Sequence, residues 1–215
     1  WGSWFVPGRN GRVAVVPGAY YWASGGRQSQ RAGPVRTAVA GRRNRLGAGG
    51  TSTRKTTLTN ALLAEVAKTA DRVVLIEDTR ELQCKAPNLV ALRTKDGVAS
   101  LSDLVRSSLR LRADRIPIGE VRGAEALDPL KALATGHPGG IGTVHAGSAL
   151  GALRRMEQLI QEAVVTVPRA LIAETIQFIA VLAGRGSDRR LAELACVEGL
   201  GSDGDYLLHA AGDCS

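Results

Sequence analysis

Acidic residues are missing from the first 46 positions of this chain of 215 residues. Those positions hold eight Arg, no Lys and no Asp or Glu, so they carry the whole formal net charge of +8, whereas residues 47–215 hold 20 basic and 20 acidic side chains. A basic excess usually indicates a nucleic-acid partner, because Lys and Arg displace counterions from phosphates. Here that inference applies to the first segment alone, and we expect no direct nucleic-acid binding by the remainder.

Cysteine and long apolar runs are also scarce. The three cysteines, Cys84, Cys196 and Cys214, lie far apart, which argues against a Cys-x-x-Cys metal module. The longest apolar run, residues 178–184, is too short to span a bilayer, so the sequence predicts a soluble chain. Hydrophobic residues nevertheless make up 44% of the chain, which is enough for a sizeable core.

The first 46 residues differ from the rest in pattern as well as in charge. They contain all three Trp and much Gly, and they show no sustained helical or strand period. Three interpretations are open: a basic nucleic-acid arm, a divergent linker, or translated sequence that does not belong to the fold, which we favour. We therefore expect residues 1–46 to lie outside the core, 47–205 to form the main domain and 206–215 to be a C-terminal tail.

Residues 49–63, GGTSTRKTTLTNALL, nearly match a phosphate-binding loop. The pattern is Gly, four free positions, Gly, Lys, and then Ser or Thr. Gly49, Lys55 and Thr56 fit it, whereas Arg54 stands where the second Gly belongs. Loop N–H groups and the following helix N-terminus suit phosphates, with Lys55 at the β and γ phosphates and the Thr56 hydroxyl at Mg²⁺. The expected nucleotide contacts are Gly49, Gly50, Thr51, Ser52, Thr53, Arg54, Lys55, Thr56 and Thr57.

Arg54 determines whether such a loop still works. The backbone here must approach the phosphates closely, and a left-handed conformation costs a non-glycine residue about 1–2 kcal/mol. The guanidinium offsets part of this cost if it pairs with a phosphate. We expect weakened nucleotide binding and a larger loss of hydrolysis, because reaction rates depend more steeply on geometry.

From residue 47 the chain alternates between helical and strand patterns. Apolar residues recur at helical spacing directly after the loop, at Leu58, Leu62 and Val66, and short apolar runs have the pattern of buried strands. Further helices are expected within 100–112, 123–136 and 149–163, and strands within 72–78, 115–120 and 139–148. Strands that alternate with helices predict a parallel sheet covered on both faces.

Polar side chains stand at the ends of three of these strands. Glu77 and Asp78 end the first, Glu120 and Arg122 end the second, and His145 follows the third. In parallel sheets the ligand lies beyond the carboxyl ends of the strands. We therefore expect these five side chains to converge at one edge, next to the phosphate loop.

Four segments, in this order along the chain, resemble the motifs of one family. They are similar to the Walker A, Asp-box, Walker B and His-box segments of the secretion ATPases of type IV secretion, particularly those of conjugal transfer. The segments are residues 49–66, 73–82, 102–128 and 136–148. The resemblance covers roughly residues 42–205, and four ordered motifs are highly specific.

The resemblance implies a RecA-like P-loop NTPase fold, an α/β domain with a mostly parallel sheet flanked by helices. It implies ATP and Mg²⁺ as cofactors, and a homo-hexameric ring that hydrolyses ATP to power pilus assembly or DNA transfer. Such a ring would be cytoplasmic and peripheral at the inner membrane, in contact with the conjugation components there. Family members also carry an N-terminal domain, and none is recognisable in residues 1–46, so the chain resembles the C-terminal ATPase domain.

Five residues are candidates for catalysis. Glu120 ends an apolar strand, where a carboxylate polarises an attacking water or holds Mg²⁺ through water, and Glu77 is the alternative general base. His145 is interpreted as a γ-phosphate sensor, with a structural hydrogen-bonding role as the alternative. Arginine neutralises charge in phosphoryl transfer, and we select Arg106 and Arg122, although most arginines near the site are expected to be solvated surface residues.

Two other functions stay open. One is an ATPase of pilus retraction or type II secretion; type II assembly ATPases often carry a tetra-cysteine metal module, which this chain lacks. The other is a remnant that binds nucleotide without turnover. Three departures favour a remnant: Arg45 and Gly47 in the strand before the loop, Pro129 inside a helical pattern, and Arg54 in the loop itself.

Overall fold

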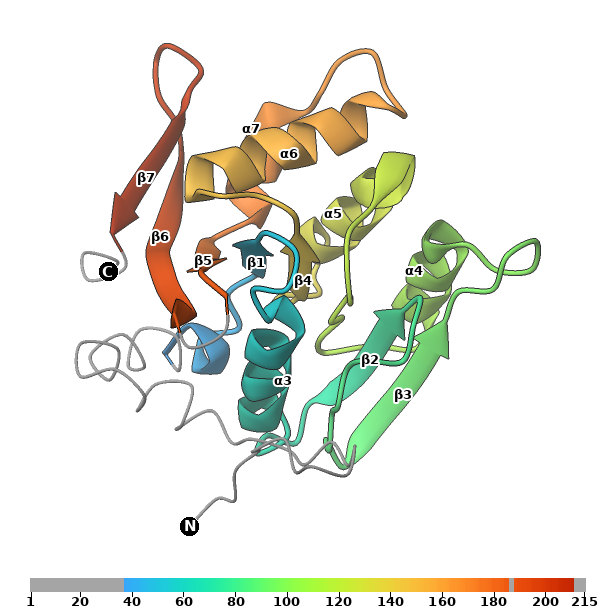
Figure 1. Ribbon diagram of the computed structural model, residues 1–215. Coiled ribbons are helices and arrows are strands. Elements are labelled where there is room, and N and C mark those ends of the chain that lie inside the picture. Colours follow the sequence, from blue (N-terminus) through green and yellow to red (C-terminus); the bar gives the residue numbers. More distant parts are fainter. Residues whose placement is uncertain (1–36, 186–187, 211–215) are drawn as a thin grey trace.

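The computed structural model describes residues 37–185 and 188–210 (Figure 1). Its strands are β1 (Arg45–Gly49), β2 (Arg72–Glu77), β3 (Asn88–Arg93), β4 (Ile141–Val144), β5 (Phe178–Ala183), β6 (Arg190–Leu200) and β7 (Tyr206–Ala210). Its helices are α3 (Lys55–Val66), α4 (Leu101–Arg110), the 3₁₀ helix η1 (Gly123–Ala126), α5 (Leu127–Ala134), α6 (Ala149–Gln161) and α7 (Arg169–Thr175). Strands and helices alternate through much of the chain, as the sequence predicts.

Five strands form the main sheet, in the order β4–β1–β5–β6–β7. Strand β1 is parallel to both β4 and β5, whereas β6 and β7 are added in antiparallel fashion. Strands β2 and β3 form a parallel pair, and residues 115–118 join this pair to β4 through isolated parallel bridges. The expected α/β class with a mostly parallel sheet is confirmed.

The expected strand at 115–120 is present only as these bridges. Pro117 has no N–H to donate, so the ladder between this segment and β2 lacks a bond there. On the other side, the Ile118 N–H donates to the Ile141 carbonyl at 2.6 Å, and the Thr143 hydroxyl donates to the Gly119 carbonyl at 2.7 Å. The segment is held in place without forming a regular strand.

Two apolar layers cover the two faces of the sheet. Successive strand residues point to opposite faces, so Val73 and Leu75 join one core while Val74 and Ile76 join the other. Helix α3 covers the first core, and the second is covered by α4, α5, α6 and α7 (Figure 1). Strand β1, which pairs with a strand on each side and is covered on both faces, lies at the centre of the fold.

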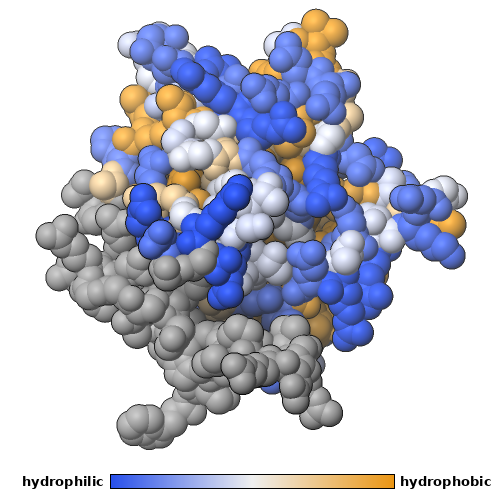
Figure 2. Space-filling model, viewed as in Figure 1, coloured by the Kyte–Doolittle hydropathy of each residue, from blue (hydrophilic) through white to orange (hydrophobic). Residues whose placement is uncertain are grey.

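The surface of the described part is largely hydrophilic. Figure 2 shows apolar residues in small separate patches on one face, between larger hydrophilic areas. The large apolar side chains that are exposed in the described ranges are Val98, Leu109, Val165 and Leu207. Within those ranges the model contains no helix that combines the length and the apolar character needed to cross a membrane.

Both expected segment boundaries require correction where the structure describes them. Strand β1 begins at Arg45, before the expected boundary at residue 47, and Ala38 and Val39 are buried in the core beneath α3. At the other end Tyr206 is buried and begins β7, which pairs with β6. Single apolar pairs and a short edge strand give too little periodicity to be recognised in the sequence. The predictions for residues 1–36 and 211–215 concern positions outside the described residues.

Strand β1 forms at the centre of the sheet despite its unfavourable composition. Arg45 is only 5% exposed, and its Nη2 donates to the Gly139 carbonyl at 3.2 Å. Its Nε and Nη1 have no hydrogen-bond partner among the described residues. Burial, together with the charge of Arg115, lowers the pKa of Arg45 to about 9. Parallel pairing on both sides outweighs the low strand propensity, at the cost of a buried charge.

Pro129 does not interrupt a helix. The expected helical segment is divided into η1 and α5, and Pro129 is the third residue of α5. Amide N–H groups in the first turn of a helix have no intrahelical acceptor, so a missing N–H costs little there. The predicted kink or mid-helix penalty is therefore wrong, and Pro129 no longer favours a damaged fold.

Candidate functional site

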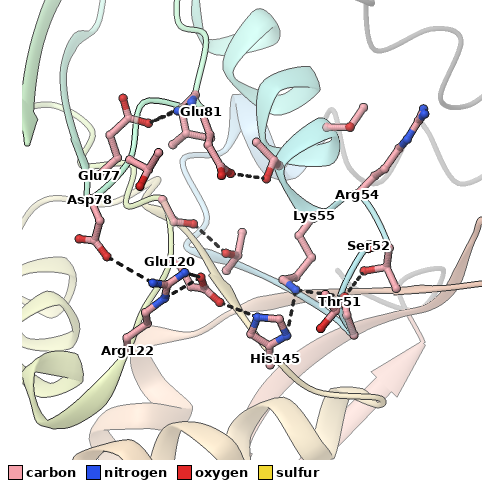
Figure 3. Close-up of a pocket in the computed structure, with 18 of the residues that line it drawn as sticks. Thr51, Ser52, Arg54, Lys55, Glu77, Asp78, Glu81, Glu120, Arg122 and His145 are labelled. Atoms are coloured by element: carbon pink, nitrogen blue, oxygen red, sulfur yellow. Dashed lines mark hydrogen bonds and ion pairs between the residues drawn. The ribbon is translucent and has the colours of Figure 1, made fainter. Parts of the chain in front are cut away.

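A cleft of about 470 Å³ lies beyond the carboxyl ends of β1, β2 and β4, at the N-terminal end of α3 (Figure 3). Its lining is dominated by charged and hydroxyl side chains. The lining residues are Gly50, Thr51, Ser52, Thr53, Arg54, Lys55, Thr56, Thr57, Glu77, Asp78, Thr79, Glu81, Leu82, Gly119, Glu120, Arg122, Thr143, His145 and Arg189. Eight of the nine expected nucleotide contacts are in this set, and Gly49 directly precedes them.

The loop between β1 and α3 is closely packed at its base. A Cβ on Gly49 would lie 2.4 Å from Thr53 Oγ1 and 2.8 Å from the Leu182 carbonyl, so glycine is required there. The Thr53 hydroxyl donates to the Gly50 carbonyl at 2.8 Å. Arg189 Nε donates to the Ser52 carbonyl at 3.3 Å. Sequence analysis did not identify Arg189, because the residue lies far from the loop along the chain.

Arg54 adopts the left-handed conformation that the sequence predicts at this position. Its φ is 67° and its ψ is 41°, and it occupies the N-cap of α3 without a capping side-chain hydrogen bond. Figure 3 shows its side chain directed away from Lys55. Ser52, for which the sequence predicts no left-handed backbone, also has a positive φ, 64°. Two non-glycine residues of this loop therefore carry backbone strain.

Lys55 reaches back over the loop and into the cleft. Its Nζ donates to the Gly49 carbonyl at 2.8 Å and to the Gly50 carbonyl at 3.2 Å, and it lies 3.3 Å from His145 Nδ1. Burial lowers the pKa of Lys55, and the charge of Arg122 acts in the same direction, while Glu120 opposes both. An anion between the loop and His145 would give this ammonium a stronger partner than two carbonyls.

Glu120, Arg122 and His145 form one hydrogen-bonded group opposite Lys55. His145 Nε2 lies 2.8 Å from Glu120 Oε1, and Arg122 Nε donates to Glu120 Oε2 at 2.7 Å. Arg122 Nη1 also lies 3.8 Å from Asp78 Oδ2. The hydrogen bond and the charge of Glu120 raise the pKa of Arg122. These residues lie together as expected from their positions after successive strands.

Glu77 is close to the cleft, but its contacts are with the backbone. The side chain is buried, and Oε2 accepts the N–H groups of Glu81 and Leu82 at 3.0 and 2.9 Å. A carboxylate that accepts two backbone N–H groups stabilises the turn that follows β2. This geometry disfavours Glu77 as a general base.

Glu81 is a carboxylate at the cleft that sequence analysis missed. It is exposed, and its Oε2 accepts a hydrogen bond from Thr56 Oγ1 at 3.1 Å. Residues 78–87 contain no helix or strand, so no periodicity marks Glu81. The available signal was its position in the Asp-box segment, four residues after Glu77.

Arg106 does not lie at the cleft, unlike the other four candidates for catalysis. It is on an exposed face of α4, where Nη2 lies 3.3 Å from Asp128 Oδ2. Helix α4 is fixed by its capping box at Ser100 and by its apolar face, which directs Arg106 toward α5. Arg115, also among the arginines near the site in sequence, is fully buried and pairs with Asp71 at 2.6 Å.

The oxygen atoms beside the loop suit Mg²⁺. Magnesium in phosphate sites usually takes one or two protein oxygens, with phosphate and water completing its octahedron. The Thr56 hydroxyl and the Glu120 carboxylate, which both line the cleft, supply such oxygens. The described residues contain no cluster of three His, Cys, Asp or Glu side chains able to hold a metal by themselves. The donor set therefore fits a metal that arrives with phosphates.

Comparison with known families identifies the class of protein that this fold and cleft define. The family model described as "Type II/IV secretion system protein" matches residues 25–196. The match covers most of the chain, and the chain belongs to this family.

Curated relatives belong to conjugal transfer and type IV secretion. The conjugal transfer protein TrbB of Rhizobium radiobacter is 46% identical over 171 residues, 79% of this chain and 53% of that protein. The type IV secretion system protein PtlH of Bordetella pertussis is 38% identical over 182 residues, 77% of this chain and 53% of that protein. The chain thus spans about half the length of the curated relatives it matches.

Solved structures agree with this assignment. The VirB11 ATPase of the Brucella suis type IV secretion system, in complex with sulphate, matches with a TM-score of 0.70 and 28% identity, over 83% of this chain and 55% of that one. The pilus retraction motor PilT with bound ADP matches with a TM-score of 0.53 and 21% identity, over 77% of this chain and 46% of that one. The second likeness shows the fold alone.

Proposed function

We propose that this chain is the ATP-binding and hydrolysing domain of a conjugal-transfer or type IV secretion ATPase. The observation that carries the proposal is the continuous set of contacts from Lys55 through His145 and Glu120 to Arg122, facing the phosphate loop. Cationic groups and backbone N–H groups on one side of a cleft, with carboxylates on the other, suit a metal-bound polyphosphate.

The loop side of the cleft binds the nucleotide in this proposal. Lys55 exchanges its carbonyl partners for the β and γ phosphates, and Thr56 turns its hydroxyl toward Mg²⁺. Mg²⁺ would supply charge neutralisation at the phosphate oxygens. The uncapped N-terminal end of α3 and the loop N–H groups provide the remaining positive potential.

We assign two of the carboxylates that line the cleft, Glu81 and Glu120, to different tasks. The position of Glu120 at a strand end predicts it as the proton acceptor, but both of its oxygens already accept hydrogen bonds from His145 and Arg122. Glu81 has one oxygen on the Thr56 hydroxyl and is exposed to the cleft, so we propose Glu81 as general base. Glu120 orients His145 as γ-phosphate sensor and Arg122 as charge-neutralising group, and it would help Thr56 to hold Mg²⁺.

The assembly follows from the relatives and is part of the same proposal. We infer that the domain works in a cytoplasmic homo-hexamer at the inner-membrane face of a conjugation or type IV secretion machine. There it powers pilus assembly or DNA transfer. The relatives are about twice as long as the matched region, so the other half of such proteins would complete the ring subunit.

Paired binding and single-turnover assays on the full chain test the proposal. Lys55→Ala should weaken MgATP binding at least tenfold, because the ammonium is the principal cation at the loop. Lys68→Ala, which removes an exposed cation just beyond the same helix, should leave binding unchanged. Equal binding by the parent and Lys55→Ala would contradict the proposal.

Two further variants test the separate tasks of the carboxylates. Glu81→Gln should lower turnover at least about a hundredfold, to a residual rate, with unchanged MgATP affinity and unchanged Mg²⁺ dependence. Glu120→Gln should also lower turnover but raise the Mg²⁺ concentration needed for binding. Retained turnover in Glu81→Gln would return the role of general base to Glu120.

A remnant that binds nucleotide without turnover is the second candidate. The observation in its favour is the left-handed backbone at both Ser52 and Arg54. Binding of MgATP without measurable hydrolysis, in the parent and in Arg54→Gly alike, would support the remnant over the enzyme.

A further inference from the structure

The segment that brings Glu81 to the cleft depends on two side chains for its shape. Residues 78–87 contain no helix or strand, so their backbone groups must find other partners. Four backbone groups of Glu81, Leu82 and Gln83 are bonded to the side chains of Glu77 and Asn60. The backbone from which the Glu81 side chain reaches the cleft is therefore held by these two residues.

Asn60 binds this segment from the side of α3. Its Nδ2 donates to the Glu81 carbonyl at 3.3 Å, and its Oδ1 accepts the Gln83 N–H at 2.8 Å. A carboxamide supplies a donor and an acceptor at once, whereas aspartate supplies acceptors only. Glu77 binds the Glu81 and Leu82 N–H groups. The segment is thus fixed by two different chemical groups.

The place of Asn60 on α3 connects this contact to the reaction. Asn60 follows Thr56 by four residues, so both lie on the same helix face. Thr56 contacts the Glu81 carboxylate, and Asn60 contacts the Glu81 backbone one turn further on. Helix α3 therefore holds both the hydroxyl at the metal position and the residue proposed to accept the proton.

We propose that Asn60 is a positioning residue for Glu81 in nucleotide hydrolysis. The inference rests on the proposed function, in which Glu81 is the general base. A displacement of about 1 Å at a reacting group costs on the order of a hundredfold in rate, while nucleotide binding through the loop is much less sensitive. Asn60 thus controls turnover without touching the nucleotide.

A double-mutant cycle in the full chain tests this role. Asn60→Ala should lower kcat about ten- to a hundredfold with the nucleotide Kd changed less than about threefold. Alanine is the better helix former, so α3 itself is not weakened. In the Glu81→Gln background, Asn60→Ala should change the residual rate less than about twofold, because the residue it positions is already disabled. The cycle is measured in the parent and in Arg54→Gly.

Hydrogen exchange tests the contact independently of turnover. In Asn60→Ala the amides of Leu82 and Gln83 should exchange at least about tenfold faster, while amides of α3 keep their protection. Asn88→Ala is the matched control, since Asn88 is an exposed asparagine at the start of β3. It should change neither exchange nor turnover.

Each outcome has a definite meaning. Unchanged exchange at residues 82–83, or equal losses from Asn60→Ala with and without Glu81→Gln, would overturn the positioning role. A parent and an Arg54→Gly chain that both bind no MgATP would instead overturn the proposed function. Turnover that depends on Asn60 only when Glu81 is present supports both the positioning role of Asn60 and the proposed function.

Discussion

Arg45 and Arg54 lie at opposite ends of the segment formed by β1 and the phosphate loop. Position 45 favours an apolar strand residue and position 54 favours Gly, but both are Arg. Arg45 has ordinary strand backbone geometry, but its guanidinium is buried beneath α3 with two nitrogen atoms unpartnered among the described residues. Arg54 has an exposed side chain, and its backbone is left-handed. Arg45 is unfavourable because of its buried side chain, and Arg54 is unfavourable because of its backbone conformation.

The difference teaches that the same residue type disturbs folding and function separately. A buried unpaired charge acts on the free energy of unfolding and leaves a distant cleft in place. A strained loop residue acts where the ligand must approach, so its effect is expected mainly in binding and rate. Stability and activity can therefore be restored independently.

The largest expected effect is on stability, from Arg45→Met. Methionine has a similar volume and no charge to bury, so the free energy of unfolding should rise by roughly 3–5 kcal/mol. Chemical denaturation at pH 7 measures it, with Arg93→Met at an exposed strand end as control. A gain no larger than that of the control would show that Arg45 is paired in solution.

The pH dependence of the stability gained in Arg45→Met tests whether the buried charge of Arg45 is its cause. The folded-state pKa of Arg45 is lowered by burial from its ordinary value to about 9, so above pH 9 the folded chain binds fewer protons than the unfolded chain. The destabilising effect is complete below pH 9 and declines as pH rises through the folded pKa. The advantage of Arg45→Met over the parent should therefore fall by roughly 1 kcal/mol between pH 8 and 10. A constant difference across this window would place its origin in packing.

Arg54→Gly should strengthen MgATP binding and raise turnover at least about tenfold, because glycine adopts the left-handed conformation freely. Arg54→Ala separates the two causes. Alanine removes the guanidinium but keeps the strain, so it should recover little. If Ala and Gly variants improve binding equally in titration calorimetry, the side chain is the obstacle and the backbone explanation fails.

The smallest effect is expected from Ser52→Gly. The variant relieves the second left-handed residue of the loop, where the gain in stability is about 1 kcal/mol or less. The Ser52 carbonyl that accepts from Arg189 is retained, so nucleotide affinity should change less than about threefold. A change in affinity as large as that of Arg54→Gly would remove the distinction between the two positions.

Much of the site could be predicted because it follows from strand ends. Glu120, Arg122 and His145 follow successive apolar runs, and the carboxyl ends of parallel strands meet at one edge. The α/β class follows from the same alternation. These inferences use only periodicity and topology, which a single sequence contains.

The parts that could not be predicted concern residues whose position depends on side-chain contacts. Arg106 is on an exposed helix face and pairs with Asp128, while Glu81 lies in a segment with no periodic pattern. The burial of Arg45 and the pairing of β7 depend on partners distant in sequence. Helical or strand periodicity cannot specify which charged groups meet across the fold.

The proline in the segment at 115–118 has a mechanical consequence for the cleft. One wall of the cleft, with Glu77 and Glu81, follows β2. The other wall, with Lys55 and His145, follows β1 and β4. The segment at 115–118 joins the β2–β3 pair to the main sheet, and Glu120 follows this segment. Pro117 leaves the pairing between this segment and β2 without one backbone hydrogen bond. The Asn60 side chain adds a connection between α3 and the segment that follows β2. The separation of the two walls therefore depends on the contacts of α3 as well as on this segment, and these contacts include the Thr56 hydroxyl and the Asn60 amide.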